Sequence, residues 1–300
     1  MIYYGAIIIA VAMFGGVFAL QDVYRRMRGS GLKISMESAC IGAFAGLIVL
    51  LAMNGFSLEF TEFTLLMATL AALDGLAFTF CSFKALDYIN LSLFSLFAML
   101  GGMLLPFLQG IIFYDEGITL AKIVCVVLVC VALAFTVEKS EKKRGTVFYI
   151  GIFILNGLSG VITKLFTSID RPKTSELGYS VWIAIITLAL SGIVWLVLSA
   201  RDKRRARLSG ERVEAMTGKV LTVSYALGAL CGIFTRVSNL LLVFALAFVD
   251  TSVQYPMVTG GIMIVSTLIS CFGARKPSKR EIVSVAFAFA AMLALFLIPV

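Results

Sequence analysis

The chain has 300 residues, of which 60% are hydrophobic and 14% charged, and its mean hydropathy is +1.02. Because charged residues make up about 25% of ordinary soluble domains, this composition excludes a soluble globular protein. The apolar residues form stretches of roughly 18 to 25, the length that a helix needs to cross about 30 Å of hydrocarbon. The sequence therefore predicts an integral membrane protein with almost no mass outside the bilayer.

Ten such stretches follow one another along the chain, and they predict an all-α membrane protein with ten transmembrane helices. Their expected bounds are residues 2–20, 34–53, 64–86, 90–113, 119–137, 146–166, 178–199, 219–244, 248–272 and 281–299.

The formal net charge of +8 is distributed unevenly along the chain. Most of the 25 Lys and Arg residues fall in the connections after the first, third, fifth, seventh and ninth stretches. This alternation is the positive-inside pattern, which places those connections in the cytoplasm and both termini outside. The basic charge thus reports topology, and we expect no nucleic-acid partner.

A duplication divides the chain into two halves of five stretches, residues 1–138 and 146–300, joined by a charged linker at 139–145. Residues 85–92 have an echo at 245–252, and the same register sets Gly101 against Gly261. Residues 4–20 also resemble 148–164, with Gly16 against Gly160. Because five crossings is an odd number, the halves must enter the membrane from opposite sides, which predicts inverted repeats.

The fourth and ninth stretches contain residues that weaken a helix. We predict helix breaks at Gly101, Gly102, Pro106, Pro256, Gly260 and Gly261. Interrupted helices at corresponding points of two repeats are typical of a transport site. The alternative is tight helix packing, because glycine lets two backbones approach closely. For the pairs Gly42-x-x-x-Gly46 and Gly228-x-x-x-Gly232, we favour packing.

Two charged residues lie inside stretches rather than at their ends: Asp74 in the third and Arg236 in the eighth. Ionisable groups at this depth are costly, and they are candidates for function by default. The two stretches are equivalent in the two halves, so we hypothesise that Asp74 and Arg236 face one cavity and pair, directly or through water. A static structural ion pair is the alternative.

Uncharged polar residues complete the candidate substrate site. Arg236 and Asn239 are three residues apart and would share a helix face. The other candidates, each of which would otherwise satisfy a neighbouring helix, are Asn156, Gln254, Tyr255, Ser92 and Ser95. A mostly apolar cavity with a few polar groups is typical of small-molecule sites.

These features resemble the EamA-type proteins of the drug/metabolite transporter superfamily along nearly the whole chain. The resemblance rests on Ala85-Leu86-x-Tyr88, residues 99–106, Glu116, Asn156-Gly157-x-Ser159-Gly160 with Lys164, and Ala245-Leu246 followed by Tyr255-Pro256. It implies a bundle in which helices 1–4 and 6–9 surround a central cavity, and transport of small metabolites, amino acids or drug-like compounds. The chain departs from the family at Leu96, where a proline is usual, and at Lys276, which stands opposite Glu116. Members usually have both termini in the cytoplasm, the reverse of the charge pattern here, so orientation stays open.

We therefore expect a secondary transporter of the cell membrane that works by alternating access, as a monomer or homodimer, without cofactor or metal. Proton coupling through Asp74 is an open alternative to a permanently ionised carboxylate. A non-transporting receptor or scaffold is the competing interpretation. An enzyme would need convergent catalytic groups, which the membrane stretches lack beyond Asp74, so we expect no enzymatic activity.

Overall fold

A computed structural model describes residues 2–113, 119–136, 145–209, 218–246, 251–273 and 276–297. Within these ranges the chain forms ten α-helices and no strand. The helices are α1 (Ile2–Arg28), α2 (Leu32–Met53), α3 (Glu62–Tyr88), α4 (Leu91–Phe113), α5 (Leu120–Thr136), α6 (Thr146–Ser168), α7 (Glu176–Ser209), α8 (Gly218–Leu246), α9 (Thr251–Phe272) and α10 (Lys279–Leu297).

Seven helices, α1–α4 and α6–α8, are long and apolar enough to cross a bilayer. In the described residues, α5 and α9 contribute apolar helical segments of fewer than 18 residues. The prediction of an all-α, multi-pass membrane protein is thus confirmed, because apolar helices of this length satisfy their own backbone in lipid.

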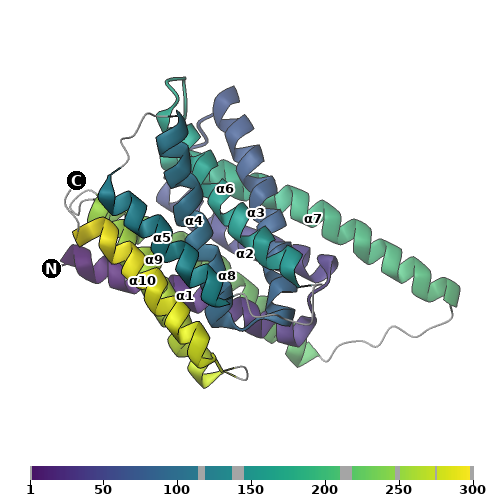
Figure 1. Cartoon of the computed structure of the whole chain (residues 1–300). Coiled ribbons are helices and arrows are strands. Elements are labelled where there is room, and N and C mark those ends of the chain that lie inside the picture. The colour runs from purple at the N-terminus through teal and green to yellow at the C-terminus, as the bar shows by residue number, and fades with distance from the viewer. Residues whose placement is uncertain are drawn as a thin grey trace.

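Eight of the helices pack side by side in a closed ring. The order around the ring is α1, α8, α2, α7, α3, α6, α4, α9 and back to α1. Each of the helices α1–α4 therefore lies between two of the helices α6–α9. The two remaining helices, α5 and α10, pack on each other outside this ring, beside α4 and α9 (Figure 1). The peripheral position expected for the fifth and tenth helices is confirmed by these contacts.

Most helix contacts have a counterpart in which each helix is replaced by the one five places along the chain. The α4–α6 contact corresponds to α9–α1, α1–α8 to α6–α3, and α2–α8 to α7–α3. The α2–α7, α4–α9 and α5–α10 contacts each map onto themselves. The packing is therefore two-fold in pattern across the two groups of five helices.

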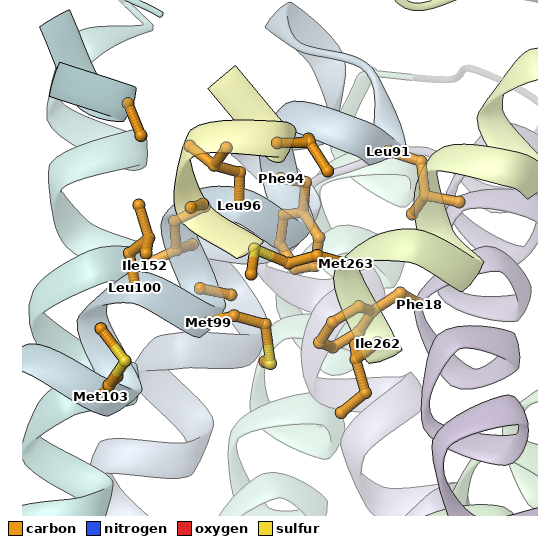
Figure 2. Close-up of a cluster of buried hydrophobic side chains, with 14 of the residues drawn as sticks. Phe18, Leu91, Phe94, Leu96, Met99, Leu100, Met103, Ile152, Ile262 and Met263 are labelled. Atoms are coloured by element: carbon orange, nitrogen blue, oxygen red, sulfur yellow. The ribbon is translucent and has the colours of Figure 1, made fainter. Parts of the chain in front are cut away.

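The largest buried cluster lies where α1, α4, α6 and α9 meet, with further residues from α3, α5, α8 and α10. Figure 2 shows its centre, where Phe94 and Leu96 of α4 lie beside Met263 of α9 and Ile152 of α6. Phe94, Leu96, Met263 and Ile152 are all fully buried. Leu96, which stands where the resembled family usually has a proline, is thus a core side chain in this protein.

The expected breaks in the fourth and ninth helices do not occur in the described backbone. α4 continues as one helix through Gly101, Gly102 and Pro106, and α9 does so through Pro256, Gly260 and Gly261. A proline removes only one backbone hydrogen bond, and the packed helices around it hold the rest of the helix in place. The alternative of tight packing accounts better for the glycines.

The glycines of α4 and α6 let these two helices touch through their backbones. A side chain at Gly101 would collide with the backbone carbonyl of Phe153, and one at Gly157 would collide with Leu105. On the other side of the two-fold pattern, α9 meets α1 in the same way. There a Cβ atom at Gly261 would lie 2.7 Å from Cγ1 of Val11.

These contacts test the register of the duplication. A Cβ atom at Gly15 would lie 2.5 Å from Cγ1 of Val265, which is 160 positions after Leu105, as Gly261 is after Gly101. These contacts agree with the predicted register of Gly101 with Gly261. They set Gly15 at the place that corresponds to Gly157, two positions from the predicted match of Gly16 with Gly160. Identity between two apolar helices is a weak guide, whereas a backbone contact requires the glycine itself.

A second glycine seam joins α2 to α8, as the packing interpretation predicted. A Cβ atom at Gly42 would lie 3.4 Å from the carbonyl oxygen of Gly228, and one at Gly232 would collide with the backbone of Gly42. Gly42-x-x-x-Gly46 and Gly228-x-x-x-Gly232 therefore face each other across one interface.

Candidate functional site in the helix ring

Asp74 is buried on α3, with a side chain that lacks a hydrogen-bond partner at Oδ1 in the described part of the chain. It lies on the side of α3 that packs against α6. Two turns before it, Met67 belongs to a buried cluster with Ile162 and Phe166 of α6. Two turns after it, Cys81 lies next to Gly151 of α6. An unsatisfied buried carboxylate is expensive, so its presence calls for a functional explanation.

Arg236 is half-buried on α8 and continues the glycine seam toward α2. It follows Gly228 and Gly232 at four-residue spacing, so it lies on the same stripe of α8. A Cβ atom at Gly46 would lie 3.0 Å from Cγ of Arg236. The absence of a side chain at Gly46 thus makes room for the arginine at the α2–α8 seam.

The structure does not bring Asp74 and Arg236 together in the pair that we hypothesised. Neither forms an ion pair or a hydrogen bond with the other in the described residues. Asp74 lies at the α3–α6 seam and Arg236 at the α2–α8 seam, on different sides of the ring. Equivalent position in two repeats sets a similar depth, but it does not set the direction in which a side chain leaves its helix.

Two of the predicted polar residues, Asn156 and Ser92, make contacts that join helices, and a third, Ser95, bonds within its own helix. Nδ2 of Asn156 donates a hydrogen bond of 2.7 Å to the carbonyl oxygen of Ala98, and it fills the space left by Gly102. The hydroxyl of Ser92 lies 2.9 Å from that of Thr267 on α9. Ser95 donates back to the carbonyl of Ser92. These contacts favour the alternative in which the polar groups satisfy neighbouring helices.

The remaining predicted site residues are Asn239 on α8 and Gln254 and Tyr255 on α9. Asn239 is exposed on α8, so it does not share the environment of Arg236. Gln254 and Tyr255 lie in the helical backbone of α9, and their side chains fall outside the described part of the structure. Glu116 and most of the 139–145 linker also fall outside it.

A buried charged cluster, which the sequence did not reveal, lies at the end of the ring where α1 ends. Arg25 donates 2.7 Å from Nη2 to Asp22 and 2.5 Å from Nη1 to Asp87 of α3. Arg28 forms an ion pair with Glu37 of α2, and both side chains are less than a tenth exposed. We refer to these five residues as the charged cluster. All five were assigned to loops or helix ends by hydropathy, which cannot tell a solvated charge from a paired one.

The same end contains the connections that the charge pattern placed together. Lys33 pairs with Asp202 at 2.8 Å, which joins the start of α2 to the extension of α7. Asn90 donates to Glu281 at 2.6 Å, which joins the start of α4 to α10. α7 has 34 residues, about 51 Å of helix, and extends beyond its neighbours (Figure 1). We call this the basic-loop end.

The opposite end has no ion pair among the described residues: uncharged groups join its elements, and the ammonium group of Lys173 donates hydrogen bonds to carbonyl oxygens at the end of α6. The backbone N–H of Thr174 donates 3.0 Å to the hydroxyl of Thr64, which is fully buried. Trp182 donates 2.7 Å from Nε1 to the carbonyl of Glu59. The rings of Phe166 and Tyr179 stack at 4.0 Å. We call this the neutral end; these contacts join α3 to the α6–α7 connection, α7 to the α2–α3 connection, and α6 to α7.

Comparison with known proteins gives a fold without a family name. No family model matches the chain, and no curated protein does. A solved structure described only as "Crystal structure of protein" matches over 97% of this chain and 96% of its own, with a TM-score of 0.59 and 16% sequence identity. At that identity the likeness extends to the fold alone.

Proposed function

We propose that this protein is a secondary transporter that moves a small metabolite, amino acid or drug-like compound by alternating access. The observation that carries the proposal is the ring of eight helices taken alternately from two groups of five, with the unsatisfied carboxylate of Asp74 buried in its wall. Transporters built from two repeats place their site near the bilayer midplane, at the interface between the repeats.

The ten helices are proposed to be two inverted repeats, 1–138 and 146–300, that each cross the membrane five times. The exchange of contacts between the two groups of helices supports this duplication, as does the common register of Gly101 and Gly261. The motifs of the sequence support membership of the EamA-type drug/metabolite transporters. The proposal includes a location in the cell membrane.

Asp74 and Arg236 are proposed to contact substrate or a coupled proton from two sides of the ring, not as a pair. Asp74 has an oxygen free to accept a hydrogen bond from a substrate or to take up a proton. Arg236 offers a planar cation to a carboxylate or phosphate. Ser92, Ser95 and Asn156 are proposed to hold the helices in place around this site.

A receptor or scaffold is the second candidate, since a membrane protein can act through surfaces without a buried site. The unsatisfied oxygen of Asp74 favours transport, because a scaffold has no use for a costly buried carboxylate.

The test begins with an untargeted comparison of metabolites in cells with and without the protein. Each compound that changes is then offered to liposomes that contain purified protein. We expect saturable uptake of at least one compound and a loss of about tenfold or more in Asp74→Asn and Arg236→Gln proteins. Unchanged uptake and pH dependence in both variants would remove the two residues from the site. No uptake of any candidate would contradict transport itself.

A further inference from the structure

α1 and α3 lie directly opposite each other in the ring, four places apart in either direction, yet they are in contact. The contact lies at the basic-loop end. Arg25 of α1 reaches Asp87 near the end of α3 at 2.5 Å, and the ring of Tyr24 meets that of Phe83 edge-on at 5.9 Å. Tyr24 and Phe83 are fully buried. At this end, therefore, the ring has no open centre.

The arginine is fixed in place by its own helix. Asp22, one turn earlier on α1, accepts hydrogen bonds from Nε and Nη2 of Arg25, which leaves Nη1 directed at Asp87. Ser30, in the turn after α1, donates to the other oxygen of Asp87. The side chains of Asp22 and Arg25 are each 10% exposed. Such a desolvated, forked arrangement is strong when intact and costly when one partner is removed.

A second layer of contacts lies seven residues deeper along α1, about 10 Å at the rise of a helix. The ring of Phe18 meets that of Phe94 of α4 edge-on at 4.9 Å, and the ring of Phe78 of α3 lies 6.4 Å from that of Phe94. Figure 2 shows Phe18 and Phe94 side by side within the buried cluster. The centre of the ring at this end is thus closed by an ionic layer above an aromatic one.

The two-fold packing pattern predicts a matching closure at the neutral end, made by α6 and α8. In the part of the chain that the structure describes, α6 and α8 make no contact comparable to that of α1 with α3. The contacts at the neutral end join α3 to the α6–α7 connection, α7 to the α2–α3 connection, and α6 to α7, and none of these contacts bridges opposite helices of the ring. Among the described residues, the closure is therefore found at one end only.

We propose that Arg25, Asp22 and Asp87, with the aromatic layer of Phe18, Phe78 and Phe94 beneath them, form a gate that closes the ring at the basic-loop end. Opening to that side separates α1 from α3 and breaks the Arg25–Asp87 contact first, because it lies outermost. The gate gives the alternating access of the proposed function, on which it rests, a specific closing element.

The test measures hydrogen exchange of backbone amides in the full-length protein, so it needs no substrate. Asp87→Asn removes the charge that holds Arg25 across the ring. We expect exchange in residues 18–28 of α1 and in the last two turns of α3 to rise about tenfold or more, since the opening that exposes these amides becomes easier. The segments around Thr64 and Thr174 at the neutral end should keep their wild-type rates.

Asp202→Asn is the matched control, because Asp202 also forms an ion pair at the basic-loop end but joins ring neighbours, α2 and α7. It should leave the exchange of α1 and α3 unchanged. Equal exchange in the Asp87→Asn and Asp202→Asn proteins would overturn the gate. Arg25→Lys, which keeps the charge but cannot reach both aspartates, is measured beside them and should give an intermediate rise.

The result separates the gate from the transport proposal. Localised exchange in Asp87→Asn supports the gate, whether or not a substrate has been found. Uptake in wild-type liposomes together with unaltered exchange in both Asp87→Asn and Arg25→Lys proteins would reject the gate and leave transport standing. A rise that spreads equally to the neutral end in both variants would assign the contact to general stability and also reject the gate.

Discussion

At the basic-loop end of the ring, two opposite helices meet through a buried arginine held between two aspartates, whereas at the neutral end a threonine pair and stacked aromatic rings join adjacent elements. The two ends differ both in which helices meet and in the side chains through which they meet. Charged contacts in a desolvated setting depend strongly on both partners and on the exclusion of water. Neutral hydrogen bonds and ring stacking are less sensitive to the loss of one partner and to the entry of water.

The comparison indicates that the two ends respond differently to the same kind of substitution. An end held by buried charges loses much of its stability when one charge is removed, and it opens when water enters. An end held by neutral contacts changes by smaller steps.

Glu37→Gln should be the most destabilising of the four, because it leaves Arg28 in a buried site without its counter-charge. Breaking a buried ion pair costs about 3 kcal/mol or more, which thermal unfolding of the purified protein would register as a large decrease in Tm. Glu62→Gln, at an exposed position on the first turn of α3, serves as the control. A similar Tm for the two variants would show that the basic-loop end does not depend on this pair.

Gly232→Val tests the glycine seam between α2 and α8. A side chain at Gly232 would meet the backbone of Gly42, which cannot move aside, so we expect a loss of about 2 kcal/mol in stability. Gly75→Val introduces the same side chain on α3, where nothing lies within 4 Å of the added Cβ atom. Thermal unfolding of both proteins measures the difference. If Gly75→Val lowers Tm as much as Gly232→Val does, the loss of stability at Gly232 does not come from its close packing against Gly42.

Thr64→Val examines the neutral end. It removes the hydroxyl that accepts from the backbone N–H of Thr174, and leaving that buried donor unsatisfied costs about 1 to 2 kcal/mol. Thr79→Val removes a hydroxyl of α3 that bonds only within its own helix, to Gly75, and should change Tm very little. A loss as large as that of Glu37→Gln would abolish the contrast between the ends.

Asp202→Asn should have the smallest effect on stability. The Lys33–Asp202 pair is 36% and 55% exposed, and exposed pairs contribute about 0.5 kcal/mol or less. Raising the salt concentration should remove even this difference from wild type, because mobile ions screen exposed charges. A large change in Tm, insensitive to salt, would mean that this end is more buried than the structure indicates.

Much of the fold follows from the sequence because the membrane imposes it. Apolar length predicts the helices, and the alternation of basic connections agrees with the contacts that gather Lys33, Asp202, Asn90 and Glu281 at one end. The 160-residue register of α4 and α9 can be predicted because Gly101 and Gly261 both lie at close helix contacts, where an added side chain would collide with a neighbouring helix. The same reasoning fails for α4 as an interrupted helix, since one proline does not break a helix that its neighbours hold.

The candidate site is less accessible to such reasoning. Asp74 and Arg236 are conspicuous because charges inside apolar stretches are rare, but their directions depend on helix rotation, which seams such as Gly46 against Arg236 decide. The gate residues cannot be recognised from the sequence, because nothing in their positions is unusual. Asp22, Arg25 and Asp87 look like ordinary charges at helix ends, and only the meeting of two opposite helices shows that Arg25, which is largely buried, is held between the two aspartates.

Spin-label distances between α1 and α3 measure whether the ring opens alternately at its two ends. One label pair at Val23 and Tyr88 reports on the basic-loop end, and another at Tyr4 and Glu62 on the other end of the same two helices; all four positions are exposed. Both pairs are placed in a protein without its six native cysteines and measured in lipid. We predict two populations, in which a longer separation at one end accompanies a shorter one at the other. A single, unchanged separation at both ends, with and without the compounds that the protein takes up, would contradict alternate opening of the ring.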